Sequence, residues 1–320
     1  PLCVWVSGTM IQVRYFIVLL LFVSCNQRKE TDANLFIKVL GVAQDAGYPQ
    51  IGCSSECCKA VQEGKETKKH VVSLALIDRN TSEYILFEAT PDITHQINEV
   101  KNSLLKDIDQ PSAVFITHAH IGHYTGLMYF GKEVMNTKNI PVYVLPKMDT
   151  FLRGNGPWSQ LVALKNIELK SFAADSTLNL FNNIKVTALQ VPHRDEFSET
   201  AGFIIETKNK KLLFIPDIDK WGKWNRNIIE LIQQVDYALL DATFYKDGEL
   251  PNRNMSEVPH PFVSESMELF KNLSTAAKQK VYFIHFNHTN PLLKINSVAA
   301  KEVRQKGFNI AMEGMILNME

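Results

Sequence analysis

The sequence predicts an α/β fold, a sandwich of mixed β-sheets with helices packed against them. Short apolar runs typical of strands recur along the chain, and longer stretches with helical spacing separate them at irregular intervals. Several strands follow one another directly in the first half, which suits a mixed-sheet sandwich better than a barrel with strict alternation. No repeat and no Gly-, Ser- or Pro-rich linker divides the chain after residue 35, so we expect one domain over 35–320.

Each predicted strand is a short run rich in β-branched, aromatic and other apolar side chains. These runs cover 36–42, 73–78, 84–88, 113–117, 142–145, 184–191, 202–206, 212–216, 237–241 and 281–285. Each predicted helix is a longer stretch whose apolar residues recur at the spacing that gives a helix one apolar face. These stretches cover 93–105, 225–234, 263–272 and 297–306.

The composition is that of a globular chain with balanced charge. The 320 residues include 34 Lys and Arg against 34 Asp and Glu, and 45% are hydrophobic. That apolar content excludes a mostly disordered chain. The zero net charge removes the basic excess with which proteins bind nucleic acids nonspecifically, so we expect a small-molecule substrate and no nucleic-acid partner. Five cysteines are too few for a disulfide scaffold at this length.

The first 34 residues are predicted to precede the fold. From Met10 the sequence has a cationic start, an apolar run over 15–23 and a small residue at Ser24, which are the parts of a secretory signal peptide. The apolar run is too short to span a bilayer, which takes about 20 apolar residues. We therefore expect a signal peptide from Met10 to Ser24 and a short tether before the domain.

The next residue, Cys25, adds to this prediction. Residues 21–25 resemble the lipobox of bacterial lipoproteins, although Phe22 stands where such boxes usually have Leu. The resemblance implies a membrane anchor through a lipid on Cys25, and export as a periplasmic or outer-membrane lipoprotein of the bacterial envelope. Export as a soluble protein is the alternative.

Three histidines lie close together at the end of a predicted strand. The strand 113–117 is followed by His118, His120 and His123. Side chains two positions apart on extended backbone share a face, so His118 and His120 can converge on one ion. Imidazole is a ligand that suits zinc, iron and manganese. A single histidine at a strand end is usually structural, but three at this spacing predict metal ligands.

Further ligand types stand at the ends of later strands. His193, Asp217 and His285 each end or directly follow a predicted strand. Taken singly, Asp217 could equally cap a helix and His193 could be structural. As a series beside the histidine loop, they provide enough ligands for a catalytic metal site with an open position.

This series resembles the metallo-β-lactamase superfamily over residues 36–320. The resemblance implies a four-layer αββα sandwich with the metal site at one edge of the sheets. It also implies an orienting role for Asp92, as an acid that holds a ligand histidine. The residues that match the superfamily's ligands are His118, His120 and His193 for a first metal, Asp217 as a bridging carboxylate, and His123 and His285 for a second metal.

One position departs from the superfamily's His-x-His-x-Asp-His motif. Gly122 stands where the motif has an Asp that ligates the second metal and often shuttles protons. Two outcomes stay open: a single metal held by the first three histidines, or a second ion held weakly by His123, Asp217 and His285. We favour the first, or a partly occupied second site. One or two zinc ions are expected, with iron or manganese as alternatives.

Three thiols, Cys53, Cys57 and Cys58, lie between the first two predicted strands. A disulfide between the adjacent Cys57 and Cys58 would be strained, and one from Cys53 to either neighbour leaves a thiol unpaired. A structural zinc with three thiolates and one imidazole uses all three. Both kinds of site stay open at this point.

The order of motifs resembles the pyrroloquinoline-quinone biosynthesis protein B family over nearly the whole predicted domain. The matching segments are Gly-Tyr-Pro-Gln at 47–50, Pro-Asp-Ile at 91–93, Thr-Gly-Leu at 125–127 and His-Phe-Asn-His-Thr-Asn-Pro at 285–291. That family lacks the first two histidines of the loop and keeps the Asp. A related phosphodiesterase holds a structural zinc with a cysteine cluster and a histidine three residues after its last catalytic histidine. This likeness implies a structural zinc on Cys53, Cys57, Cys58 and His288.

These observations predict a metal-dependent hydrolase of an ester or phosphodiester. A bound metal lowers the pKa of water towards neutrality and stabilises negative charge on a carbonyl or phosphoryl oxygen. Asp217 would orient the nucleophile. The substrate class rests on analogy with the superfamily. Two alternatives stay open: an iron-dependent oxidative enzyme, and a catalytically degenerate binding lipoprotein, which Gly122 favours. His260 is a weaker candidate for substrate contact.

Overall fold

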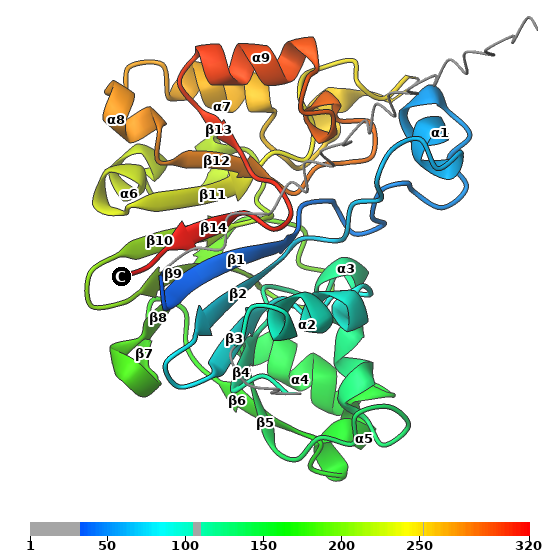
Figure 1. Ribbon diagram of the computed structural model, residues 1–320, viewed down its shortest axis with the longest axis vertical. Coiled ribbons are helices and arrows are strands. Elements are labelled where there is room, and N and C mark those ends of the chain that lie inside the picture. Colours follow the sequence, from blue (N-terminus) through cyan, green and yellow to red (C-terminus); the bar gives the residue numbers. More distant parts are fainter. Residues whose placement is uncertain (1–32, 105–109, 252) are drawn as a thin grey trace, which may run out of the picture. The chain divides into compact units, whose positions relative to one another are not determined.

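Two β-sheets packed face to face form the centre of the computed structural model (Figure 1). The structure describes residues 33–104, 110–251 and 253–320. The predicted signal peptide and the lipid-bearing Cys25 lie outside these residues, so both stay predictions. Among the described residues, no helix is both long and apolar enough to cross a lipid bilayer.

The first sheet is mixed and contains seven of the described strands. Four strands at one end pair antiparallel, and the pairs from β3 to β6 are parallel. Their order across the sheet is β14 (Ile316–Asn318), β1 (Leu35–Gly41), β2 (Ser73–Asp78), β3 (Glu83–Phe87), β4 (Ala113–Phe115), β5 (Ile140–Val144) and β6 (Ile167–Ser171).

The second sheet is also mixed and contains another seven of the described strands. The pairs from β13 to β10 are parallel, and those from β10 to β7 are antiparallel. Their order is β13 (Asn309–Ile310), β12 (Val281–Ile284), β11 (Tyr237–Asp241), β10 (Lys211–Ile215), β9 (Thr200–Glu206), β8 (Lys185–Val191) and β7 (Thr177–Asn179).

Helices cover the outer face of each sheet, which gives the four predicted layers (Figure 1). Beside the first sheet lie α2 (Ile93–Lys101), α3 (Ile121–Tyr124), α4 (Pro146–Gly154) and α5 (Trp158–Ala163). Beside the second lie α6 (Ile228–Gln234), α7 (Val263–Leu269), α8 (Thr275–Lys278) and α9 (Val298–Gln305). The short α1 (Glu56–Gln62) belongs to the loop after β1, and 3₁₀ turns occur at Thr125–Phe130, Phe181–Asn183, Trp221–Lys223, Met255–Glu257 and Pro291–Leu293.

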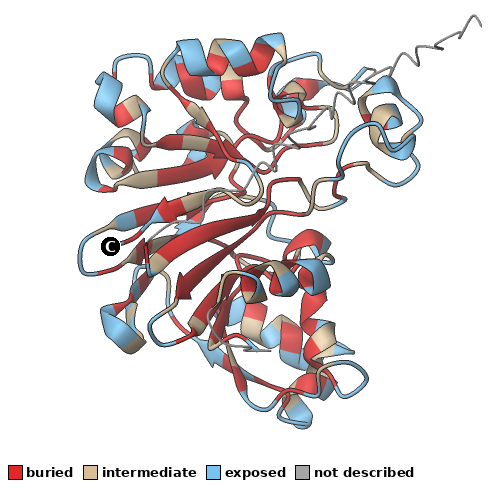
Figure 2. Cartoon of the chain, in the orientation of Figure 1, coloured by how far each residue is buried: buried red, intermediate tan, exposed pale blue. Residues whose placement is uncertain are grey.

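Alternating side chains of the strands feed two apolar cores. On β1, Ile37 and Val39 belong to the core between the sheets, whereas Phe36 packs with the helices outside the first sheet. This is the alternation expected of a strand buried on both faces. The sheets meet where Phe203 contacts Phe87, with ring centroids 5.8 Å apart. Figure 2 shows buried residues filling the strands and exposed residues following the outer sides of the helices.

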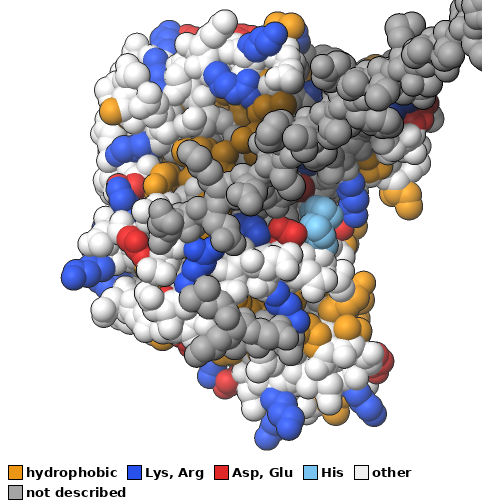
Figure 3. All heavy atoms as spheres, in the orientation of Figure 1, with side chains coloured by type: hydrophobic (Ala, Val, Ile, Leu, Met, Phe, Trp, Pro, Cys, Tyr) orange, Lys and Arg blue, Asp and Glu red, His pale blue; other side chains and the backbone are white. Residues whose placement is uncertain are grey.

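On the face shown in Figure 3, Lys and Arg side chains are scattered among acidic and uncharged ones and do not form one continuous patch. This distribution agrees with the balanced composition of the chain.

Candidate metal centre

The ends of strands from both sheets bring the predicted ligands together. His118 and His120 follow β4, His123 lies in α3, and His193, Asp217 and His285 follow β8, β10 and β12. Their candidate ligand atoms form groups in which all atoms lie within 4.8 Å of one another. The two main groups are His118, His120, His193 and Asp217, and Asp45, His123 and His285, while Asp217 also groups with His260 and His285.

In the first group, three imidazole nitrogens face the Asp217 carboxylate. His118 Nε2 lies 2.7 Å from His120 Nδ1 and 3.7 Å from Asp217 Oδ2. His193 Nε2 lies 3.5 Å from Asp217 Oδ1. Ligands about 2.1 Å from a zinc ion at the tetrahedral angle stand about 3.4 Å apart, so the two separations from Asp217 are those of a metal-binding set. The shorter separation between His118 and His120 is that of a hydrogen bond between the two rings.

The outer nitrogens of His118 and His120 have partners of their own, whereas His193 Nδ1 has none among the described residues. Thr117 Oγ1 lies 2.9 Å from His118 Nδ1, and Glu196 Oε2 lies 3.4 Å from His120 Nε2. Such partners orient the ring and direct the other nitrogen towards a metal. His120 remains 15% exposed, whereas His118 is buried, so the group reaches solvent on the side of His120.

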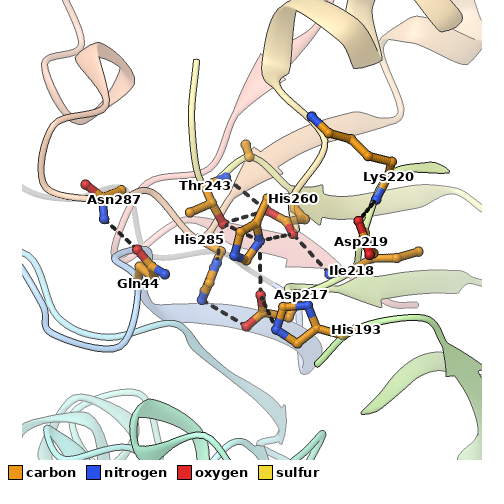
Figure 4. Close-up of polar contacts among 12 residues, drawn as sticks. Gln44, His193, Asp217, Ile218, Asp219, Lys220, Thr243, His260, His285 and Asn287 are labelled. Atoms are coloured by element: carbon orange, nitrogen blue, oxygen red, sulfur yellow. Dashed lines mark hydrogen bonds and ion pairs between the residues drawn. The ribbon is translucent and has the colours of Figure 1, made fainter. Parts of the chain in front are cut away.

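The second group is built around His123. Its Nε2 lies 3.2 Å from Asp45 Oδ1 and 3.1 Å from Asp217 Oδ2, and His285 Nε2 lies 3.3 Å from Asp217 Oδ2. Figure 4 shows the rings of His193, His260 and His285 turned towards Asp217. Asp217 Oδ1 faces His193, and Oδ2 faces His123 and His285, so the carboxylate lies between the two groups, as a bridging carboxylate does.

Five buried atoms of the second group and Asp217 have no hydrogen-bond partner in the described part of the chain. His123 Nδ1 faces Glu88, and the other four are ligand-type atoms of the centre: Asp45 Oδ1, Asp217 Oδ1, His123 Nε2 and His285 Nε2. A buried polar group left unpaired costs about 1–3 kcal/mol, so such atoms are rarely brought together without a ligand. A divalent cation would satisfy them, and the residues therefore fit a metal.

The electrostatics of the centre also favour a cation. Burial acts to lower the pKa of His123, but Glu88 and contacts with Asp217 and Asp45 outweigh it, so that pKa stands well above its ordinary value. Burial holds the pKa of His193 at about 4. His193 is therefore neutral at pH 7 and presents a lone pair, which is the form that binds a metal.

The three thiols form a separate cluster with His288. Cys53, Cys57 and Cys58 are free, so the disulfide alternative is not realised. Cys53 Sγ lies 3.7 Å from Cys57 Sγ, which in turn lies 4.0 Å from Cys58 Sγ. Thiolates about 2.3 Å from a tetrahedral zinc stand about 3.8 Å apart. His288 Nδ1, buried and without a hydrogen-bond partner among the described residues, is within ligand reach of all three.

The family of the chain follows from a match to the β-lactamase superfamily domain over residues 83–286. This segment is more than half of the 320 residues and carries the histidine loop, His193, Asp217 and His285. The chain belongs to the β-lactamase superfamily. Both the predicted superfamily and the predicted four-layer fold are thereby confirmed.

Individual superfamily relatives agree with this assignment. Coenzyme PQQ synthesis protein B from Acinetobacter baumannii is 25% identical over 319 residues, which covers 89% of this chain and 100% of the relative. Zinc-bound PqqB from Methylobacterium extorquens matches the structure with a TM-score of 0.74 at 21% identity, over 88% of this chain and 99% of that one. A diphosphatase from the PhnP family matches with a TM-score of 0.63 at 20% identity, over 88% and 96%. The predicted likeness to the biosynthesis protein B family is confirmed.

The orienting role expected of Asp92 from the superfamily resemblance falls to another acid. Asp92 accepts hydrogen bonds from Lys68 Nζ and Val71 N, both at 2.9 Å, so it holds the segment before β2 and touches no ligand histidine. Glu88, fully buried at the end of β3, places Oε1 3.4 Å from His123 Nδ1. Because β3 pairs with β4, an acid at its end reaches the histidine loop directly.

His260 belongs to the centre, which its lone position in the sequence did not reveal. Its Nδ1 lies 2.8 Å from Asp241 Oδ2 and 3.3 Å from Asp217 Oδ1 (Figure 4). Burial acts to lower the pKa of His260, but the charge and hydrogen bond of Asp241 outweigh it, so that pKa is raised. Its buried position against Asp217 makes it part of the polar network, and no spacing signal in the sequence marks it.

Asp45 is the other residue that the ligand pattern did not reveal. It lies in the loop after β1, far from the histidine motif in sequence. The signal that could have found it is the loss of an acid at Gly122, since a superfamily centre that lacks one carboxylate needs another from elsewhere.

Proposed function

We propose that this chain is a metal-dependent hydrolase that acts on an ester or phosphodiester. The observation that supports this most strongly is the convergence of His118, His120 and His193 on Asp217. A metal held there supplies, when bound, a Lewis acid and a water whose pKa falls towards neutrality. Three histidines are a ligand set that catalytic zinc uses, with the fourth position left for water.

The residues around this group have distinct tasks. Burial alone would raise the pKa of Asp217, but His285, His193 and the other rings hold it well below its ordinary value. Asp217 therefore stays ionised and can accept a hydrogen bond from an attacking water. His260, hydrogen-bonded to Asp241 with a raised pKa, can hold a proton beside Asp217 Oδ1.

The exposed side of the centre favours an anionic substrate. Arg194 lies beside His120, with Nη2 3.2 Å from Nε2, and its side chain is 55% exposed. A guanidinium at this position can bind phosphate oxygens, and a charged phosphate gains more from it than a neutral ester does. The shared fold with a protein described as a diphosphatase supports the same preference.

A second candidate function is favoured by the likeness to coenzyme PQQ synthesis protein B. In this case the same imidazoles hold iron, and the reaction is oxidative. Metal analysis of protein purified without added metal separates the two. Zinc with ester hydrolysis supports the hydrolase, and iron with substrate-dependent oxygen consumption supports the oxidative enzyme.

The hydrolase is tested with bis(4-nitrophenyl) phosphate and 4-nitrophenyl acetate as substrates. We expect the zinc-loaded protein to hydrolyse the phosphodiester and the double variant His118→Ala/His120→Ala to fall to background. The control variant is His95→Ala, which removes an exposed histidine that stacks on His70 and lies in neither group. Equal activity of the double variant and the wild type would refute the proposal.

A further inference from the structure

The position of the missing motif acid is occupied by another residue. A Cβ added at Gly122 would lie 2.3 Å from Asp45 Oδ1 and 2.5 Å from Asp45 Cα. No side chain fits at that separation, so Gly122 cannot be exchanged for a larger residue while the loop of Asp45 stays in place. The carboxylate of Asp45 thus fills the volume in which the side chain of the motif acid would start.

The contact between Asp45 and His123 is not a hydrogen bond. The two atoms, Asp45 Oδ1 and His123 Nε2, are 3.2 Å apart, yet neither has a partner with hydrogen-bond geometry among the described residues. Both are buried, and His123 is fully enclosed. A buried polar atom without a hydrogen-bond partner calls for an explanation, and a metal ion between these two atoms would satisfy both.

The spacing of the group matches that of metal ligands. The separations of Asp45 Oδ1 and Asp217 Oδ2 from His123 Nε2 are 3.2 and 3.1 Å, and that of Asp217 Oδ2 from His285 Nε2 is 3.3 Å. The tetrahedral expectation for nitrogen and oxygen ligands of zinc is about 3.4 Å. Asp45, His123 and His285 form one group of ligand atoms within 4.8 Å of one another, and Asp217 approaches this group through His123 and His285.

We propose that Asp45 supplies the carboxylate that Gly122 lacks and completes a second metal site with His123, His285 and Asp217. The inference rests on the proposed metal-dependent function and deepens it. It replaces the sequence-based expectation of a single metal or a weakly held second ion. The superfamily motif takes this carboxylate from the histidine loop, whereas this chain takes it from the loop after β1. The centre can therefore bind two metals.

The loop that carries Asp45 is held firmly against the segment that carries His285. Gln44 N donates to Phe286 O at 2.9 Å, and Phe286 N donates to Val42 O at 2.8 Å. Asn287 Nδ2 donates to Gln44 Oε1 at 2.6 Å (Figure 4). Asp45 and His285 are therefore fixed relative to each other before any ion binds, which lowers the entropic cost of binding.

The cysteine cluster joins the same two segments a second time. Cys53, Cys57 and Cys58 continue the loop of Asp45, and His288 continues the segment of His285. An ion in this cluster would close both segments into one rigid unit. The cluster therefore acts as a positioning device for the proposed ligand pair.

Metal content tests the inference directly. Wild type, Asp45→Asn and Asp45→Ala are each loaded with zinc, dialysed, and measured by mass spectrometry. We expect the wild type to retain two ions at the catalytic centre besides one at the cysteine cluster, and both variants to lose one equivalent. The control Asp195→Asn removes an exposed carboxylate that pairs with Lys147 and belongs to no ligand group, and should keep every ion.

The outcomes separate this inference from the proposed function. Circular dichroism of the metal-free variants checks that they are folded. Full metal content in folded Asp45→Asn and Asp45→Ala, or a single catalytic ion in the wild type, overturns the role of Asp45. The hydrolysis test with His118→Ala/His120→Ala is scored independently, because loss of phosphodiesterase activity does not report how many ions the wild type holds.

Discussion

Thr243→Val is expected to weaken metal binding through His285. Thr243 Oγ1 donates to Asp241 Oδ1 at 2.7 Å and lies 2.9 Å from His285 Nδ1. With its proton committed to Asp241, the hydroxyl accepts the Nδ1 proton of His285, and the ring therefore presents Nε2 to Asp217 as a lone pair. Valine keeps the shape of threonine but removes both hydrogen bonds and the contact of the hydroxyl with His260 Nδ1, at 3.1 Å.

The size of the effect of Thr243→Val depends on which hydrogen bonds Asp241 and His285 keep without the hydroxyl. Asp241 Oδ1 retains the Thr243 backbone N–H at 2.9 Å, so the main loss falls on the buried Nδ1 of His285. One buried donor without a partner costs about 1–3 kcal/mol of unfolding free energy. Removing the partner of a ligand histidine typically weakens metal affinity by about 10–100-fold.

The assay is a competition titration against a chromophoric chelator, together with thermal unfolding of the metal-free protein. Thr243→Ser is the matched control, because it keeps the hydroxyl and loses only a methyl group. We expect Thr243→Ser to bind zinc nearly as the wild type does and Thr243→Val to bind it more weakly. Equal affinity and equal unfolding temperature of Thr243→Val and the wild type would refute the assigned role of the hydroxyl.

Three further predictions address the apolar core, the protonation of His193 in the metal-free protein, and the cysteine cluster. Phe203→Ala, which empties a contact between the sheets, should cost about 3–5 kcal/mol in urea unfolding, and an unchanged midpoint would contradict the packing. The pKa of His193 is about 4 in the folded protein, against an ordinary value of 6.5. The neutral ring therefore contributes to the free energy of unfolding of the metal-free protein fully above pH 6.5, and this contribution is lost as the pH falls towards 4. His193→Gln should therefore flatten the fall of the unfolding temperature between those pH values, and an identical profile would argue against it. Cys58→Ser should release the structural ion and lower the unfolding temperature of the loaded protein only, as shown by metal analysis and calorimetry with and without chelator.

Elements with a continuous apolar signal could be predicted from the sequence, and elements whose signal depends on the tertiary structure could not. The buried strand β11 was predicted with the bounds it has, Tyr237–Asp241. The strand β6 was missed because Glu168 and Lys170 are exposed on a sheet edge, so only alternate residues of a short segment are apolar. The strand β14 was missed because its three residues gain their conformation by pairing with β1.

The same division holds for the metal centre. The histidine loop and Asp217 follow strands, and the common end of neighbouring strands brings them together by topology alone. Glu88 also stands at a strand end, but a carboxylate there has many structural uses, and its relation to His123 depends on the β3–β4 pairing. The position of Asp45 is harder to predict than that of Glu88. Its neighbour Gly122 lies in another segment and has no side chain that could indicate a contact.

Gly122 taken alone favours a degenerate centre, but its surroundings favour an exchange of ligands. A centre that had lost its function would be expected to fill the vacated volume with an apolar side chain, since nothing would then select for a charge in a buried place. The volume instead contains the carboxylate of Asp45, whose loop is tied by backbone hydrogen bonds to the segment of His285. Three carboxylates, those of Asp45, Glu88 and Asp217, surround His123, and placing them together is costly unless cations balance their charge. The glycine is therefore better explained as the space that Asp45 requires than as the trace of a lost activity.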